Sequence, residues 1–263
     1  MEEKLKELDN KITNIEKDEN LEEVEPSTYI LEKGKLYKSN GLSVLALKEF
    51  ELVIEKSKSF NLLMEAVFEI MHLAIGNKDM VLLKKYLDIC KKKLTDGGDW
   101  EKRNRMKVYE GLYCILNREF KEAGKLFIDA LMTFTTYELF DYKTFVFYTS
   151  ICNIISVDRN TLKTRIIDNS DVVACIKDIP HLEEFLEYYY TGQYALFLSV
   201  FLKIIQRLKT DFFISKHVGY FIKEMRVKAY SQYLRNFFII RIIQISYIRQ
   251  HGKLFWSFIR IYR

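Results

Sequence analysis

The sequence predicts an all-α protein built as a TPR-like solenoid of antiparallel helix pairs, and two observations support this. A chain of 263 residues contains only two prolines, Pro26 and Pro180, and ten glycines. Few residues therefore interrupt helices. In addition, small and aromatic residues recur at fixed offsets along the chain, which is typical of repeat architectures whose neighbouring units bury each other's apolar faces.

The repeat consists of a small residue on one helix and an aromatic residue on the next. The first copy comprises Gly34, Tyr37, Ala46 and Phe50, with Asn40-Gly41 at the turn. The same offsets recur at Gly111, Cys114, Ala123 and Phe127, and a looser copy lies between them at Met71, Leu83, Leu87 and Cys90. In this tetratricopeptide pattern the small residue lets the second helix lie close, while the Ala and the aromatic ring fill the groove.

The N-terminal region predicts one short amphipathic helix followed by an acidic linker. Apolar residues in heptad-like spacing define the helix, and they are Met1, Leu5, Leu8, Ile12 and Ile15. We expect this helix to dock on the body of the protein or on a partner. We divide the chain into this segment (residues 1–25), a helical-repeat domain (26–234) and a basic apolar tail (235–263).

The stretch from Gly97 to Tyr148 organises the middle of the chain. Gly97 and Gly98 end one helix, and we expect the Asp99 carboxylate to cap the next. The predicted buried side of that helix comprises Trp100, Asn104, Val108, Gly111, Leu112 and Ile115. Because glycine destabilises a helix interior by about 1 kcal/mol relative to alanine, Gly111 indicates close contact with a partner helix over 122–132.

Five further helices are expected after this hairpin. The apolar pattern predicts helices over 137–156, 161–167, 194–208 and 216–233, and Pro180 is expected to open another, with Glu183 and Glu184 in its first turn. Polar turns at 168–171 and 191–193 separate them. Each helix pair leaves an apolar face for its neighbour to cover, so mutual burial is the main stabilising contribution.

The positive charge is concentrated in the tail. Residues 235–263 contain six Lys or Arg and no Asp or Glu, so removing them from a net charge of +5 leaves residues 1–234 at −1. The body therefore does not favour nucleic-acid binding. Arg241 interrupts the tail's apolar run well short of the roughly 20 residues that span a bilayer. A tail lying on a membrane surface is a minor alternative, and we expect no membrane partner.

The sequence offers no catalytic, cofactor-binding or metal-binding residues. Cys90, Cys114, Cys152 and Cys175 form no C-x-x-C pair, which fits a reducing compartment. The histidines His72, His181, His217 and His251 lack metal-ligand spacing, and His72 follows a core pattern. No phosphate-binding loop or nucleophile motif occurs. We therefore expect neither an enzyme nor a small-molecule substrate.

One cluster combines basic and aromatic residues near the start of the predicted helix after Gly98. Its members are Trp100, Lys102, Arg103, Arg105, Lys107 and Tyr109. A solvated helix face or a protein-docking ridge is favoured over nucleic-acid contact, because the body as a whole is close to neutral. Partner-binding residues are otherwise not identifiable from the sequence.

Three blocks of sequence carry a resemblance to a known family. The first comprises Gly97–Trp100, Arg103–Tyr109 and Gly111–Cys114, the second Phe134–Leu139 with Asp141–Val146, and the third Glu224–Gln232. Together they resemble the non-ATPase regulatory subunit 6 family of the 26S proteasome lid, a group of PCI proteins. The signalosome subunit 1 family is the next most similar, but the Gly-Gly-Asp-Trp and Tyr-Lys-Thr-Phe segments favour the proteasome family.

The resemblance implies a non-catalytic scaffold that supports degradation of ubiquitinated proteins. The expected partners are other PCI-family lid subunits and the ATPase ring, and the expected location is cytoplasmic and nuclear. The alternatives are a scaffold of a related complex such as the COP9 signalosome, or a truncated product that does not assemble. The last alternative arises because residues 237–263 do not match the winged helix that follows in the family.

Overall fold

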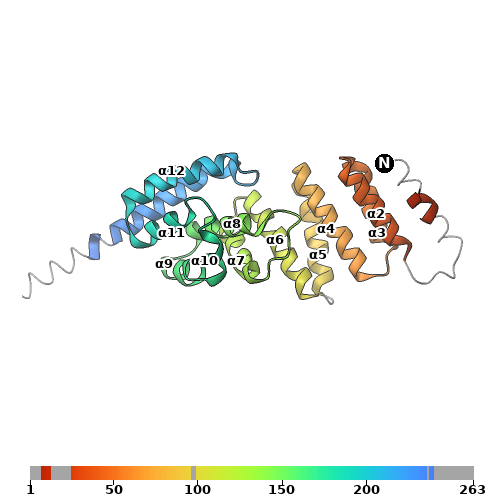
Figure 1. Cartoon of the computed structure of the whole chain (residues 1–263), viewed down its shortest axis with the longest axis horizontal. Helices are drawn as coiled ribbons and strands as arrows, with labels where there is room; N and C mark the ends of the chain where they lie inside the picture. The colour runs from red at the N-terminus through yellow and green to blue at the C-terminus, as the bar shows by residue number, and fades with distance from the viewer. Residues whose placement is uncertain (1–6, 13–24, 96–98, 236, 240–263) are drawn as a thin grey trace, which may run out of the picture. The chain divides into compact units, whose positions relative to one another are not determined.

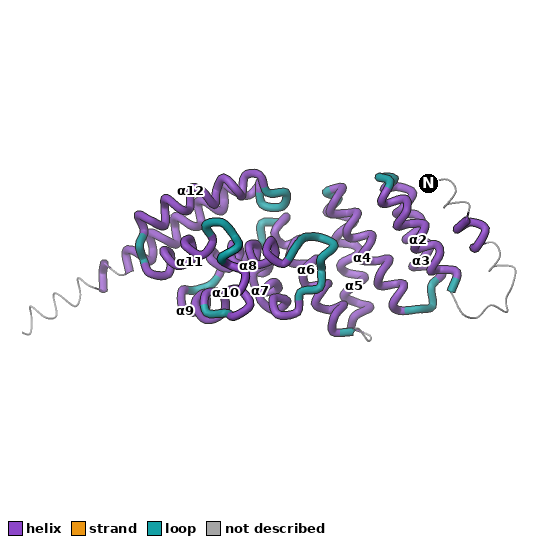
Figure 2. The backbone as a smooth tube through the Cα atoms, viewed as in Figure 1, coloured by secondary structure: helices purple, strands orange, loops and turns teal. Residues whose placement is uncertain are grey.

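The computed structural model describes residues 7–12, 25–95, 99–235 and 237–239, and these contain helices and turns without a strand (Figures 1 and 2). This confirms the all-α prediction. The helices run in the order α2 Pro26–Ser39, α3 Ser43–Lys56, α4 Phe60–Asn77, α5 Met80–Thr95, α6 Trp100–Leu116, α7 Phe120–Ala130, α8 Tyr142–Ser156, α9 Arg159–Leu162, α10 Ser170–Ile176, α11 Leu182–Thr191 and α12 Tyr194–Thr210, with a last helix at 218–235.

The chain divides into two compact units that we describe separately. Unit 1 comprises Met1–Asn117 and Lys125–Tyr142, and unit 2 comprises Arg118–Gly124 and Lys143–Arg263. This division concerns compactness, and the domain boundaries 1–25, 26–234 and 235–263 remain predictions. No helix among the described residues combines the length and the hydropathy needed to cross a membrane.

Unit 1 is a run of consecutive helices, each packed on the next from α2 to α6 (Figure 1). The buried residues of α4 cover most of its circumference, because it contacts α2, α3 and α5. The remaining stripe is polar and carries Glu65, Glu69 and His72, which meet lysines of α2. The turn predicted at Asn40-Gly41 is present, with Gly41 at φ +77° between α2 and α3, and Lys78 has φ +58° between α4 and α5.

The two copies that match the repeat pattern most closely form the contacts predicted for them. A Cβ atom built on Gly34 would lie 2.5 Å from a ring carbon of Phe50, and one built on Gly111 would lie 2.3 Å from a ring carbon of Phe127. Phe50 and Phe127 are fully buried. The absence of a side chain at each glycine is therefore what allows the aromatic ring to lie against the preceding helix.

Several details of the middle stretch differ from the predictions. Asp99 occupies the N-cap position of α6, but its side chain makes no capping hydrogen bond. Trp100 is 62% exposed rather than buried, because at the first position of α6 it precedes the buried stripe. The predicted helix 137–156 begins only at Tyr142. The partner helix predicted at 122–132 is α7, which ends at Ala130 and continues as a 3-10 turn, Leu131–Thr133.

Unit 2 is built around α8, whose residues from Phe145 to Ile154 are all buried. Part of the predicted helix 161–167 is a π-helical turn, Lys163–Ile167, that follows α9. Pro180 lies before α11 rather than opening it, because His181 adopts φ +63° as the N-cap residue. Glu183 and Glu184 do occupy the first turn of α11, and Gly192 with φ +78° ends it as predicted.

Three aromatic rings join α11 to α12 in the interior of unit 2. Phe185 stacks on Phe197 and Phe201 with ring centroids 5.1 and 5.7 Å apart. The ring of Phe201 in turn lies 6.0 Å from Phe221 of the last helix. Buried aromatic pairs of this kind add about 0.5–1.5 kcal/mol to the energy of apolar burial. The predicted last helix at 216–233 corresponds to a 3-10 turn, Ser215–His217, followed by helix 218–235.

Candidate functional site

The first and second sequence blocks meet in unit 1 through a single carboxylate. Glu138 accepts a hydrogen bond from Arg105 Nε at 2.6 Å and another from the Tyr109 hydroxyl at 3.1 Å. The Arg105 guanidinium also lies 4.3 Å from the ring centroid of Phe68. We call these four residues the Glu138 cluster. It fastens the turn that precedes α8 to the buried side of α6 and to α4.

The ionisation of the Glu138 cluster fits a structural role. Burial alone would lower the pKa of the Arg105 guanidinium, but Glu138 and Tyr109 more than offset this, so its pKa is raised. Burial, reinforced by the Glu138 carboxylate, raises the pKa of Tyr109 well above its usual value. Arg105 therefore stays cationic and Tyr109 neutral, so neither group is prepared to exchange a proton with a substrate.

A second polar group connects α2 to α4. Lys38 forms an ion pair with Glu69 at 2.6 Å and also contacts the Nδ1 atom of His72. Lys35 pairs with Glu65 one turn away. His72, predicted to lie in the core, is half-buried, and its ring nitrogen has a protein partner. This arrangement joins α2 to α4.

We predict that His72 makes unit 1 less stable as the pH falls below about 6.5. Burial and the neighbouring charge of Lys38 lower the pKa of His72, with Arg105 acting in the same direction and Glu69 and Glu138 opposing them. The unfolded chain therefore binds a proton at a higher pH than the folded chain does. The stabilising contribution is complete above the unfolded pKa and is lost as the pH falls through the folded value.

Melting temperatures measured between pH 7.5 and 5 test this prediction for the His72→Gln variant. Its melting temperature should decline less steeply than that of the unchanged chain over this interval. His181→Asn is the matched control, because His181 is exposed at the start of α11 in unit 2. An identical pH dependence for His72→Gln and the unchanged chain would contradict the prediction.

The third block, Glu224–Gln232, also serves packing. Met225 is fully buried, and the Lys228 ammonium donates to the carbonyl of Val157 at 2.6 Å and more weakly to that of Ile154 at 3.4 Å. These carbonyls belong to the last turn of α8 and the residue after it, where a cation is favourable. Burial lowers the pKa of Lys228, with Asp158 and Glu224 opposing the shift.

The predicted basic-aromatic cluster does not form one surface. Tyr109 is buried, and Arg105 belongs to the Glu138 cluster. Lys102 lies over the ring of Phe60 at 5.4 Å and contacts Asn61, while Trp100 projects from the start of α6. The sequence pattern placed these residues together because they are adjacent in the chain, whereas the helix distributes them over different faces.

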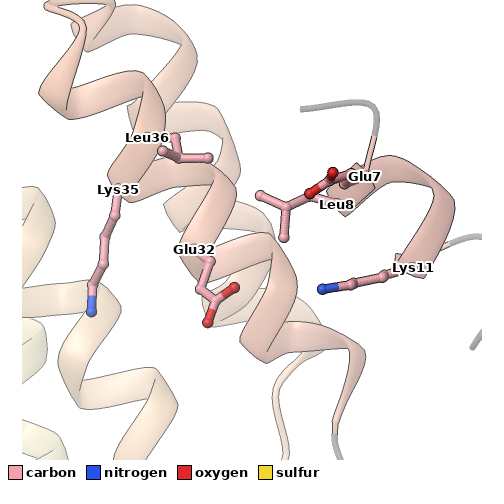
Figure 3. A pocket seen from close by; sticks show the side chains of 6 residues that line it. All are labelled: Glu7, Leu8, Lys11, Glu32, Lys35 and Leu36. Atoms are coloured by element: carbon pink, nitrogen blue, oxygen red, sulfur yellow. The ribbon is translucent and has the colours of Figure 1, made fainter. Parts of the chain in front are cut away.

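The described part of the N-terminal helix docks on unit 1. Figure 3 shows Leu8 directed toward Leu36 of α2, with Lys11 and Glu32 at the edges of a groove of about 400 Å³. Leu8 is buried, Asp9 pairs with Lys33 at 2.9 Å, and Lys11 lies over the Tyr29 ring. These contacts confirm docking on the body for residues 7–12, while Met1, Leu5 and Ile15 lie outside the described residues.

The described residues contain no cluster of three or more His, Cys, Asp or Glu arranged to hold a metal ion. Cys90, Cys114 and Cys152 are buried thiols, and burial raises the pKa of Cys90 to about 12. A thiol with so high a pKa is a poor nucleophile near neutral pH. His251 lies outside the described residues.

Residues 1–165 match the protein family described as 26S proteasome subunit RPN7. The chain is 39% identical over 237 residues to the 26S proteasome non-ATPase regulatory subunit 6 of Oryza sativa subsp. japonica, and 40% identical over 236 residues to the homolog of this subunit from Arabidopsis thaliana. Each match covers 90% of this chain, which spans 60% of the length of each relative. The Arabidopsis COP9 signalosome complex subunit 1 is 25% identical over 135 residues, 51% of this chain and 31% of the relative.

Proposed function

The chain belongs to the 26S proteasome subunit RPN7 family, and from this premise we propose that it is a non-catalytic scaffold subunit of the lid of the proteasome regulatory particle. The family match carries the proposal. In this role the chain supports the ATP-dependent degradation of ubiquitinated proteins and binds other PCI-family lid subunits and the ATPase ring. The proposed location is cytoplasmic and nuclear, without a cofactor, a small-molecule substrate, a nucleic acid or a membrane as a partner.

The side chains of the three blocks support this proposal by the way they are used. Glu138, Arg105 and Lys228 hold helices and turns together within their units. A chain whose distinctive polar residues serve to fix helix packing is suited to present rigid surfaces to neighbouring proteins.

Mass spectrometry of 26S proteasomes purified from the source organism tests the proposal. The tryptic peptide from Val108 to Arg118 should be present in proportion to the peptides of other lid subunits, and the peptide from Leu254 to Arg260 would show that the tail is incorporated too. Recovery of this chain with signalosome subunits instead would favour the COP9-type scaffold. Its absence from both complexes would favour a product that does not assemble.

A further inference from the structure

One face of unit 2 exposes apolar side chains along two antiparallel helices. α12 and helix 218–235 contact each other through Tyr194 and Tyr233, whose ring centroids are 5.7 Å apart. Between the two helices runs an apolar groove of about 220 Å³, which we call the α12 groove. It is lined by Tyr194, Leu198, Arg226, Ala229, Tyr230 and Tyr233.

The apolar surface continues along both helices beyond the groove itself. Leu202 lies one turn beyond Leu198 on the same side of α12 and is 64% exposed, and Tyr230 is 61% exposed on the opposite wall. The adjoining inner face of α12 is buried, with Phe197 and Phe201 in the interior. An exposed apolar face of this kind is one that another helix can cover.

The two helices that line the α12 groove are basic, and Arg226 lines the groove itself. Exposed cations on its two helices include Lys203, Lys209, Lys223 and Arg226, and no acidic residue of the described chain forms an ion pair with them. Glu224 is the only acidic residue on α12 and helix 218–235 together. The lysines of α2 differ, because Lys33, Lys35 and Lys38 are all neutralised by carboxylates of unit 1.

We propose that the α12 groove binds an amphipathic helix of a partner protein, with leucine-like residues at i, i+4 and i+7 and Asp or Glu on the flanks. The apolar stripe would receive the leucines, and the unpaired cations would face the carboxylates. This chain's own residues 240–263 are a poor match, because they carry five Lys or Arg and no Asp or Glu. The inference adds a partner class to the proposed scaffold role, but its test uses the purified chain alone, so either can fail without the other.

Fluorescence anisotropy with the full chain tests the proposal. The probe is a labelled helical peptide with leucines at the stated spacing and glutamates on both flanks, and a matched peptide carries lysines in place of the glutamates. The glutamate peptide should bind saturably, and Leu202→Glu should weaken binding at least tenfold, or about 1.4 kcal/mol. Arg226→Glu should weaken the glutamate peptide and strengthen the lysine peptide.

The control places the same added charge on another surface. Val81→Glu alters a residue of α5 in unit 1 that is 82% exposed, so it should leave peptide binding unchanged. Circular dichroism would verify that each variant remains helical. Peptide binding that is indifferent to Leu202→Glu and Arg226→Glu would overturn the proposal. So would binding to vesicles of phosphatidylcholine and phosphatidylserine in the absence of peptide binding, since that result would identify a membrane-binding face.

Discussion

Replacing Gly111 with leucine should lower the free energy of unfolding of unit 1 by about 3 kcal/mol or more. A Cβ atom at this position would lie 2.3 to 2.9 Å from three ring carbons of Phe127. Phe127 is fully buried and cannot rotate away without displacing other interior side chains. α6 and α7 would therefore have to separate, and the groove filled by the phenylalanine would open.

Urea denaturation followed by circular dichroism measures this loss, and Gly76 provides the matched control. Gly76 also lies inside a helix of unit 1, but a Cβ atom there would have no neighbour within 4 Å. Gly76→Ala should therefore leave stability unchanged or raise it by up to about 1 kcal/mol. An unchanged stability of Gly111→Leu would contradict the close contact between Gly111 and Phe127.

The contact between Gly111 and Phe127 could be predicted because it is local and repeated. Two helices joined by a short turn must be antiparallel neighbours, so a glycine on one and a phenylalanine at a fixed offset on the other point to the same place. The same pair recurs at Gly34 and Phe50, so the prediction did not depend on a single copy of the repeat. The turns at Gly41 and Gly192 could also be predicted, because glycine tolerates the positive φ that tight turns often require. Both residues do adopt a positive φ.

The Glu138 cluster could not be predicted in this way. Glu138 is 33 residues from Arg105 in sequence, and no period or offset relates the two. The apolar periodicity predicted a helix that begins at residue 137. In the structure, residues 137–139 form a turn and α8 begins at Tyr142. A pattern of hydrophobic residues reports which face is buried but not which carboxylate crosses to a distant helix. The resemblance blocks contained all three polar residues, but their pairing required the structure.

Glu138→Leu should destabilise unit 1 by about 2 kcal/mol, because it leaves two donors in a largely buried position without their acceptor. Arg105 Nε and the Tyr109 hydroxyl both donate to Glu138 Oε1. The side chains of Arg105 and Glu138 are 25% and 28% exposed, so water recovers part of the loss and the effect falls below that of a fully buried pair. Urea denaturation gives the change in unfolding free energy.

Two comparisons separate the cluster from ordinary surface electrostatics. The ion pair of Lys143 and Asp178 has side chains 52% and 56% exposed, so Asp178→Leu should change stability by less than about 0.5 kcal/mol.

In a double-mutant cycle, Arg105→Met combined with Glu138→Leu should destabilise less than the sum of the two single changes, because the second change removes a donor already left unpaired. Strict additivity would mean that Glu138 does not hold Arg105. The turn before α8 would then be anchored by the apolar contacts of Phe134, whose ring lies 5.8 Å from that of Tyr142.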